Sequence, residues 1–155
     1  MAIEIPENIL KSMIDYLNKA REEISRLYPP SVSSYLADLK SVACFLGDYK
    51  LAFALDYLIE VIDNLEYSDV FEKFSKYEDL RRMIEFFSKG KEDQTLLDFL
   101  AAEIPTEFSD FSKSLSNALD SIERYIKNEI DFKLVIESLV EFMKSADTLR
   151  KSQGW

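Results

Sequence analysis

Residues 48–65, DYKLAFALDYLIEVIDNL, hold the pattern that decides the fold. Asp48 is a residue type that caps helix N-termini, and no glycine or proline interrupts the segment that follows it. Apolar side chains fill most of that segment at helical spacing. It therefore predicts a strongly apolar helix from about Tyr49 to Leu65, at the centre of the core.

The same three-to-four-residue spacing extends outward through nearly the whole chain, and no alternating strand pattern competes with it. Pro29-Pro30, Gly47 and Pro105 mark helix ends. The expected helices cover about residues 6–28, 31–46, 49–65, 68–76, 77–89 and 93–103, with two more beginning at Thr106 and Asp131. The prediction is an all-α fold of about seven to eight helices in one compact domain over residues 1–155, or in two packed helical lobes.

Two details refine this prediction. The helix after Thr106 carries one clear apolar stripe, formed by Phe108, Phe111, Leu115, Leu119, Ile122 and Ile126. A short likeness also links Asp48-Tyr49-Lys50-Leu51 with Asp131-Phe132-Lys133-Leu134, which is too short to indicate a duplication.

The composition excludes several kinds of catalytic site. With no histidine in 155 residues, histidine triads, histidine metal sites and phosphohistidine chemistry are ruled out. One cysteine cannot form an intrachain disulfide, a CxxC pair or a protein-held iron–sulfur cluster. Cys44, which lies among apolar neighbours, is expected to be a small buried side chain. Three glycines leave little room for a glycine-rich phosphate loop.

The net charge limits the partners. Nineteen basic and 29 acidic residues give a formal charge of −10, which opposes wrapping duplex DNA but permits a local basic patch or a basic protein partner. The first residues do not form a signal peptide, and no run of 18 apolar residues occurs. We therefore expect a cytoplasmic protein without a membrane contact, and its Lys, Glu and Ile content resembles that of thermophiles.

A locally basic stretch runs through residues 73–91. It holds six basic and three acidic residues, with aromatic residues interleaved. Arginine and lysine side chains of this kind can hold a triphosphate or a nucleic-acid backbone, and an exposed aromatic ring can stack on a base. The more ordinary interpretation is a solvated helix face over a phenylalanine core.

Three carboxylates, Asp56, Glu60 and Asp63, fall on one face of the apolar helix. Such a face can bind Mg²⁺ or a basic partner, and without a second ligand group we favour a solvated acidic stripe.

Four motifs, taken in order, resemble the C-terminal domain of the large subunit of archaeal and eukaryotic primase. They span about residues 28–90 and comprise Tyr28-Pro29-Pro30-Ser31-Val32, Leu51-Ala52-Phe53-Ala54-Leu55, residues 67–74 (YSDVFEKF) and Arg81-Arg82-Met83-Ile84-Glu85-Phe86. The family carries a 4Fe–4S cluster on four cysteines. Here Ser31 stands at the first cysteine position and Ala52 at a family arginine. The chain is thus similar to the clusterless third, non-catalytic primase subunit of some archaea.

The resemblance implies an accessory role in primer initiation, in which this chain binds the initiating nucleotide or the 5′-triphosphate of the primer. The implied partners are the catalytic and large primase subunits and a nucleoside triphosphate, with the single-stranded template as a further candidate. No cofactor is expected, and catalytic metal ions would belong to a partner. Arg81 occupies the family's arginine position. Charge and nearness in sequence add Arg82, Lys89 and Lys50 to the candidate phosphate site, and Tyr77 is the candidate for base stacking.

Two alternatives stay open. Residues 39–58 are also similar to the helix pair around the phosphorylated histidine of histidine phosphotransfer bundles, and that histidine would fall at Ala37. A bundle without the histidine could dock a receiver domain but could not relay phosphate. The other alternative is an unrelated helical adaptor.

Overall fold

The computed structural model describes residues 4–25, 30–66, 69–86, 91–103 and 106–152. These ranges form helices and contain no strand, so the all-α prediction is confirmed for them. The helices are α1 (Glu7–Ser25), α2 (Pro30–Leu46), α3 (Tyr49–Glu66), α4 (Asp69–Phe86), α5 (Lys91–Glu103), α6 (Thr106–Ile126) and α7 (Phe132–Ser152).

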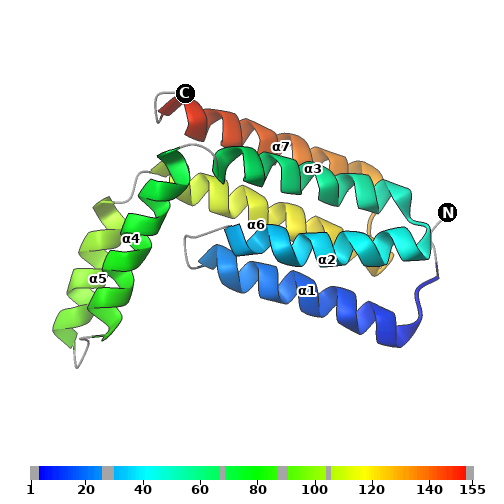
Figure 1. Cartoon of the computed structure of the whole chain (residues 1–155), viewed down its shortest axis with the longest axis horizontal. Coiled ribbons are helices and arrows are strands. Elements are labelled where there is room, and N and C mark those ends of the chain that lie inside the picture. Colours follow the sequence, from blue (N-terminus) through cyan, green and yellow to red (C-terminus); the bar gives the residue numbers. More distant parts are fainter. Residues whose placement is uncertain (1–3, 26–29, 67–68, 87–90, 104–105, 153–155) are drawn as a thin grey trace.

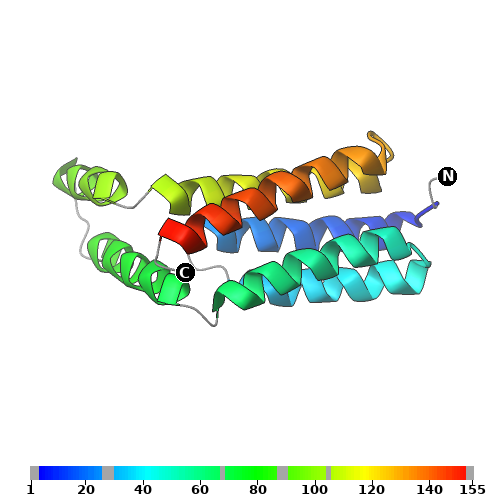
Figure 2. The ribbon, with the colours of Figure 1, turned by 90° about the horizontal axis from the view of Figure 1, so that it is seen from above.

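Five of these helices, α1, α2, α3, α6 and α7, lie side by side as an elongated bundle (Figure 1). Helix α2 packs between α1 and α3, while α6 contacts both α1 and α7, and α3 contacts α7. Helices α4 and α5 form an antiparallel hairpin that projects from one end of the bundle (Figure 2). The molecule is therefore a bundle with a helical hairpin inserted between α3 and α6.

The core is filled by leucine, alanine and phenylalanine side chains from the five bundle helices. The predicted stripe of α6 is buried throughout, as expected. Phe111 of this stripe packs against Phe142 of α7, with ring centroids 5.3 Å apart. Helix α3 buries its apolar face from Leu51 to Leu65. Its predicted place in the core is therefore confirmed.

Two sequence predictions were wrong. Residues 68–89, expected as two helices, contain one continuous helix over the described range Asp69–Phe86, because no glycine or proline interrupts that range. Cys44, expected to be buried, is exposed. It follows Ala43, the last buried residue of α2, and a step of one residue turns a side chain by about 100° around a helix.

Helices α2 and α6 end in the same way, at the turns that lead into α3 and α7. Gly47 has φ 79° and Asn128 has φ 61°, the left-handed conformation common after helix C-termini. Gly47 N donates to the carbonyl of Cys44, and Asp48 N donates to that of Ala43. In the second turn, Asn128 N donates to the carbonyl of Tyr125, and Glu129 N donates to that of Arg124.

Charged side chains join neighbouring helices of the bundle. Arg21 of α1 forms ion pairs with two carboxylates of α6, Asp120 at 2.9 Å and Glu123 at 3.0 Å. Burial opposes ionisation of Glu123, but Arg21 outweighs it and the pKa of Glu123 is lowered. Lys40 of α2 binds Asp56 of α3 at 2.6 Å. No helix in the described part of the chain is long and apolar enough to span a membrane.

Candidate functional site

The candidate phosphate-binding residues lie in two separate places. Tyr77, Arg81 and Arg82 belong to α4, whereas Lys50 lies in the first turn of α3. Because α3 has 18 residues, it separates its two ends by about 27 Å. Lys89 lies outside the described residues. The structure thus groups the two arginines with Tyr77 and does not bring Lys50 to them.

The two arginines differ in their surroundings. Arg82 is exposed, whereas the Arg81 side chain is partly covered. The Arg81 Nη1 atom donates to Oε1 of Glu85, one turn further along α4, at 3.3 Å. Exposed pairs of this spacing contribute only about 0.3–0.5 kcal/mol in helices. A phosphate group would compete with Glu85 for the Arg81 guanidinium.

Tyr77 joins the hairpin to the bundle. Its ring meets Phe108, in the first turn of α6, edge to face, with centroids 6.1 Å apart. Tyr77 is only partly exposed and packs against the core. Its role in base stacking stays a prediction, and the core contact leaves only part of the ring for a base.

The hairpin also exposes large apolar side chains. Phe86 is 80% exposed and Phe99 is 65% exposed, and Met83 and Leu96 are about half exposed. In both helices an exposed apolar residue directly precedes a more buried one, as Met83 precedes Ile84 and Phe99 precedes Leu100. Each helix of the hairpin therefore carries a row of exposed apolar side chains.

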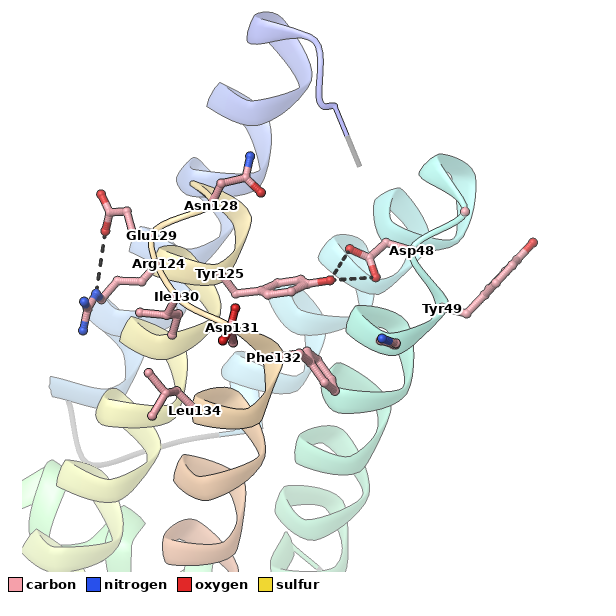
Figure 3. A pocket seen from close by; sticks show the side chains of 12 residues that line it. Asp48, Tyr49, Arg124, Tyr125, Asn128, Glu129, Ile130, Asp131, Phe132 and Leu134 are labelled. Atoms are coloured by element: carbon pink, nitrogen blue, oxygen red, sulfur yellow. Dashed lines mark hydrogen bonds and ion pairs between the residues drawn. The ribbon is translucent and has the colours of Figure 1, made fainter. Parts of the chain in front are cut away.

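Lys50 lines a different feature, an open pocket at the far end of the bundle (Figure 3). The pocket has a volume of about 970 Å³ and lies between the start of α3, the end of α6 and the start of α7. At its centre the Tyr125 hydroxyl donates to Oδ2 of Asp48 at 3.1 Å, and the backbone N–H of Leu51 donates to Oδ1 of Asp48 at 3.2 Å. The Tyr125 ring meets Phe132 edge to face at 5.3 Å. This cluster ties the three helices together.

The chemistry of this pocket is structural. The Asp48 carboxylate is buried and accepts hydrogen bonds from two donors, so its oxygens are already used. The other charges are mixed: Lys50 and Arg124 face Glu129 and Asp131, which gives no net attraction for an anion. The described residues contain no group of three histidine, cysteine, aspartate or glutamate side chains placed to hold a metal ion.

Tyr125 makes the stability of the fold depend on pH. Burial, together with the charge and hydrogen bond of Asp48, raises the pKa of Tyr125 to about 12 from its ordinary 10.0. Between these two values the unfolded chain loses the proton and the folded chain keeps it, so the stabilisation is complete below pH 10 and disappears as the pH rises to 12.

We therefore expect Tyr125→Phe to lower the free energy of unfolding by about 1 kcal/mol at pH 8. The difference from the unaltered chain should shrink above pH 10 and change sign before pH 12, because the folded unaltered chain must then ionise a partly buried tyrosine beside Asp48, which the phenylalanine variant avoids. Urea unfolding at a series of pH values measures it. Both chains contain the same other tyrosines and the same lysines, so the contribution of those groups to the free energy of unfolding cancels in the difference. A difference that stays constant up to pH 12 would contradict the assignment.

Sequence reasoning identified Asp48 as a helix cap but missed Tyr125 as its partner. The available signal was the likeness between residues 48–51 and 131–134. Both segments begin a helix, after turns that contain Gly47 and Asn128, at the same end of the bundle. The likeness therefore reflects a shared local structure, and it points to the two turns that Tyr125 connects.

No protein-family model, curated protein or solved structure matches this chain. A functional proposal must therefore rest on its own residues and on the surfaces that its helices form.

Proposed function

We propose that this chain is a non-catalytic accessory subunit and that the α4–α5 hairpin is the part that contacts its partners. The observation that carries the proposal is the projection of α4 beyond the bundle, with Arg81 and Arg82 adjacent on it. The motif resemblance suggests the assembly, an archaeal primase with its catalytic and large subunits.

In this proposal Arg81 and Arg82 contact the phosphates of the initiating nucleotide or of the primer 5′-triphosphate. A guanidinium group suits this role because its planar fork binds two phosphate oxygens at once. Holding one nucleotide in advance reduces the entropy lost when two nucleotides are brought together for the first bond. The metal ions that assist that bond belong to the catalytic partner.

The apolar rows of the hairpin support docking to a protein. Exposed phenylalanine and methionine side chains, such as Phe86 and Met83, are enriched at interfaces, and rows on paired helices fit a groove of a partner. The hairpin can thus hold the partner subunit on one face and place the arginines near its active site.

We expect the double variant Arg81→Ala, Arg82→Ala to bind a nucleoside triphosphate about a hundredfold or more weakly, since it loses two charge-assisted bonds worth about 1.5–3 kcal/mol each. Glu85→Gln should strengthen binding, because it removes the carboxylate that competes for Arg81. Fluorescence anisotropy with a labelled ATP, at low and high ionic strength, measures both effects, and circular dichroism verifies the helical fold.

The matched control is Lys11→Ala, Lys133→Ala, which removes the same charge at the opposite end of the bundle. Equal weakening in both double variants would mean that the nucleotide responds only to net charge. No nucleotide binding by the unaltered chain would contradict the phosphate role.

A second experiment addresses the assembly itself. Purification of the native protein from its source cell should recover catalytic and large primase subunits in stable proportion. Recovery of a receiver-domain protein in place of the primase subunits would favour the phosphotransfer-like adaptor. If primer initiation were unchanged in the Arg81→Ala, Arg82→Ala variant, these arginines would have no part in initiation.

A further inference from the structure

Helix α7 carries a second apolar row besides the one that faces the core. The row in the core comprises Val135, Leu139, Phe142, Ala146 and Leu149, all of them buried. The second row comprises Ile136, Val140 and Met143, which are 45%, 39% and 38% exposed. Lys133 and Asp147 continue the second row at its two ends, with the same alternating intervals of three and four residues. We refer to residues 133, 136, 140, 143 and 147 together as the outer seam.

The outer seam has the spacing of a contact between two helices. Side chains at alternating intervals of three and four residues lie along one face of a helix, where they can pack against a matching row on another helix. Each apolar residue of the seam directly follows a buried residue, so the seam is turned by about 100° from the row in the core. The core of this chain therefore does not cover it.

The charges along the outer seam have an order. Lys133 begins the seam and Asp147 ends it. Beside the seam, Glu137 precedes Lys144 by one heptad, so the two side chains lie on one line along the helix. A helix with the same sequence that runs in the opposite direction would therefore present a basic group to each acidic one.

The other charges near the outer seam are mixed and do not favour either sign. Lys144 forms an ion pair with Glu141 at 3.4 Å, and Asp147 forms one with Arg150. Both pairs lie within a single turn of α7 and are at least partly exposed, and such pairs are weak. The pocket beside the start of α7 holds both basic and acidic groups. Over its whole length α7 has four basic and three acidic residues, a formal charge of +1, although the chain carries −10.

We propose that the outer seam joins two copies of this chain, which pair through α7 in antiparallel orientation about a two-fold axis at Val140. In this pairing Val140 meets the same residue of the second copy, and Ile136 meets Met143. Glu137 then lies opposite Lys144 of the second copy, and by symmetry this pair occurs twice. The ends of the seam, residues 133 and 147, meet in the same way.

The charges select this orientation over a parallel one. In a parallel pair each residue would meet its own counterpart, so Glu137 would lie opposite Glu137 and Lys144 opposite Lys144. Like charges placed together in this way oppose association. The order of charges on α7 therefore complements itself only when the two helices run in opposite directions.

The dimer leaves both hairpins uncovered. Helix α7 begins beside the pocket and ends near the end of the bundle from which α4 and α5 project (Figure 1). Antiparallel pairing of α7 therefore places the two hairpins at opposite ends of the dimer. The proposal goes beyond the accessory role of α4 and does not depend on nucleotide binding.

Sedimentation equilibrium of the full chain tests the association. The apolar part of the seam is short, so we expect a reversible dimer that forms at high protein concentration, as small interfaces do. Concentrations up to roughly 1 mM, in about 0.15 M salt to screen the net charge, cover this range. A chain that stays monomeric throughout would overturn the proposal.

Matched variants locate the contact. Val140→Glu should weaken the dimer roughly tenfold or more, because it places two carboxylates together on the two-fold axis. Val140 is 39% exposed, and circular dichroism verifies that the fold is kept. The control is Phe86→Ser, Phe99→Ser, which removes exposed side chains from the hairpin and should leave the dimer unchanged. A dimer that persists in Val140→Glu, or that is lost in the control, would overturn the proposal.

Charge reversal tests the orientation. Glu137→Lys and Lys144→Glu should each weaken the dimer severalfold, because each change creates two like-charged pairs across the contact. The double variant Glu137→Lys, Lys144→Glu should recover most of the loss, since opposite charges face each other again. Single variants without effect, or a double variant that does not recover, would overturn the antiparallel pairing.

Discussion

Phe142→Ala is expected to lower the free energy of unfolding by about 3–5 kcal/mol. Phe142 is completely buried in α7 and packs on Phe111 of α6, with ring centroids 5.3 Å apart. Removing the ring loses its transfer free energy and leaves a cavity that the two helices cannot close without moving. Since domains are stable by only about 5–15 kcal/mol, this one change would remove a large share of the total.

Urea unfolding followed by circular dichroism measures this loss. The matched control is Phe53→Ala, which removes the same ring from a position that is 75% exposed. This variant should stay within about 0.5 kcal/mol of the unaltered chain. Similar losses in the two variants would mean that the packing of α6 on α7 is not as described.

Asp48→Ala is expected to lower the free energy of unfolding by about 1.5–2.5 kcal/mol. Two losses combine: the helix cap at Leu51 N contributes about 1 kcal/mol, and the bond from Tyr125 contributes about 0.5–1.5 kcal/mol. Asp48→Asn should cost less than 1 kcal/mol, because asparagine caps helices as well as aspartate and still accepts from the tyrosine. Thermal and urea unfolding of both variants measure the difference.

A double-mutant cycle separates the two contributions. The bond between Asp48 and Tyr125 should appear as a coupling of about 0.5–1.5 kcal/mol between Asp48→Ala and Tyr125→Phe. The capping contribution should remain when Tyr125 has already been replaced. If the two losses simply add, with no coupling, then the hydroxyl and the carboxylate do not stabilise each other.

Most of the fold could be predicted because helical spacing is a local signal. The stripe of α6 and the cap at Asp48 depend on residues within a few turns, and both are present in the structure. The errors arose where the signal was weak. Helix α4 was divided although no helix-breaking residue separates its parts, and Cys44 was judged by its neighbours in sequence rather than by its position around the helix.

The candidate site could be predicted only in part, because a site depends on which helices meet. Arg81 and Arg82 share α4, so their nearness follows from the sequence alone. Lys50 was added by nearness in sequence, and the length of α3 places it at the other end of the bundle. Tyr125 lies 77 residues from Asp48, and the packing of both α6 and α3 on α7 brings them together.

The hairpin also has a consequence for how the chain folds. Contacts within α1–α3 and within α6–α7 join neighbours in sequence, whereas α6 on α1 and α7 on α3 are distant pairings. A flexible connection across residues 67–105 would lose closure entropy each time those distant pairings formed. Because α4 and α5 return the chain to the end of the bundle that it left, their helices shorten the effective loop before α6 docks (Figure 1). We therefore expect the hairpin to speed assembly of a bundle whose core it scarcely enters.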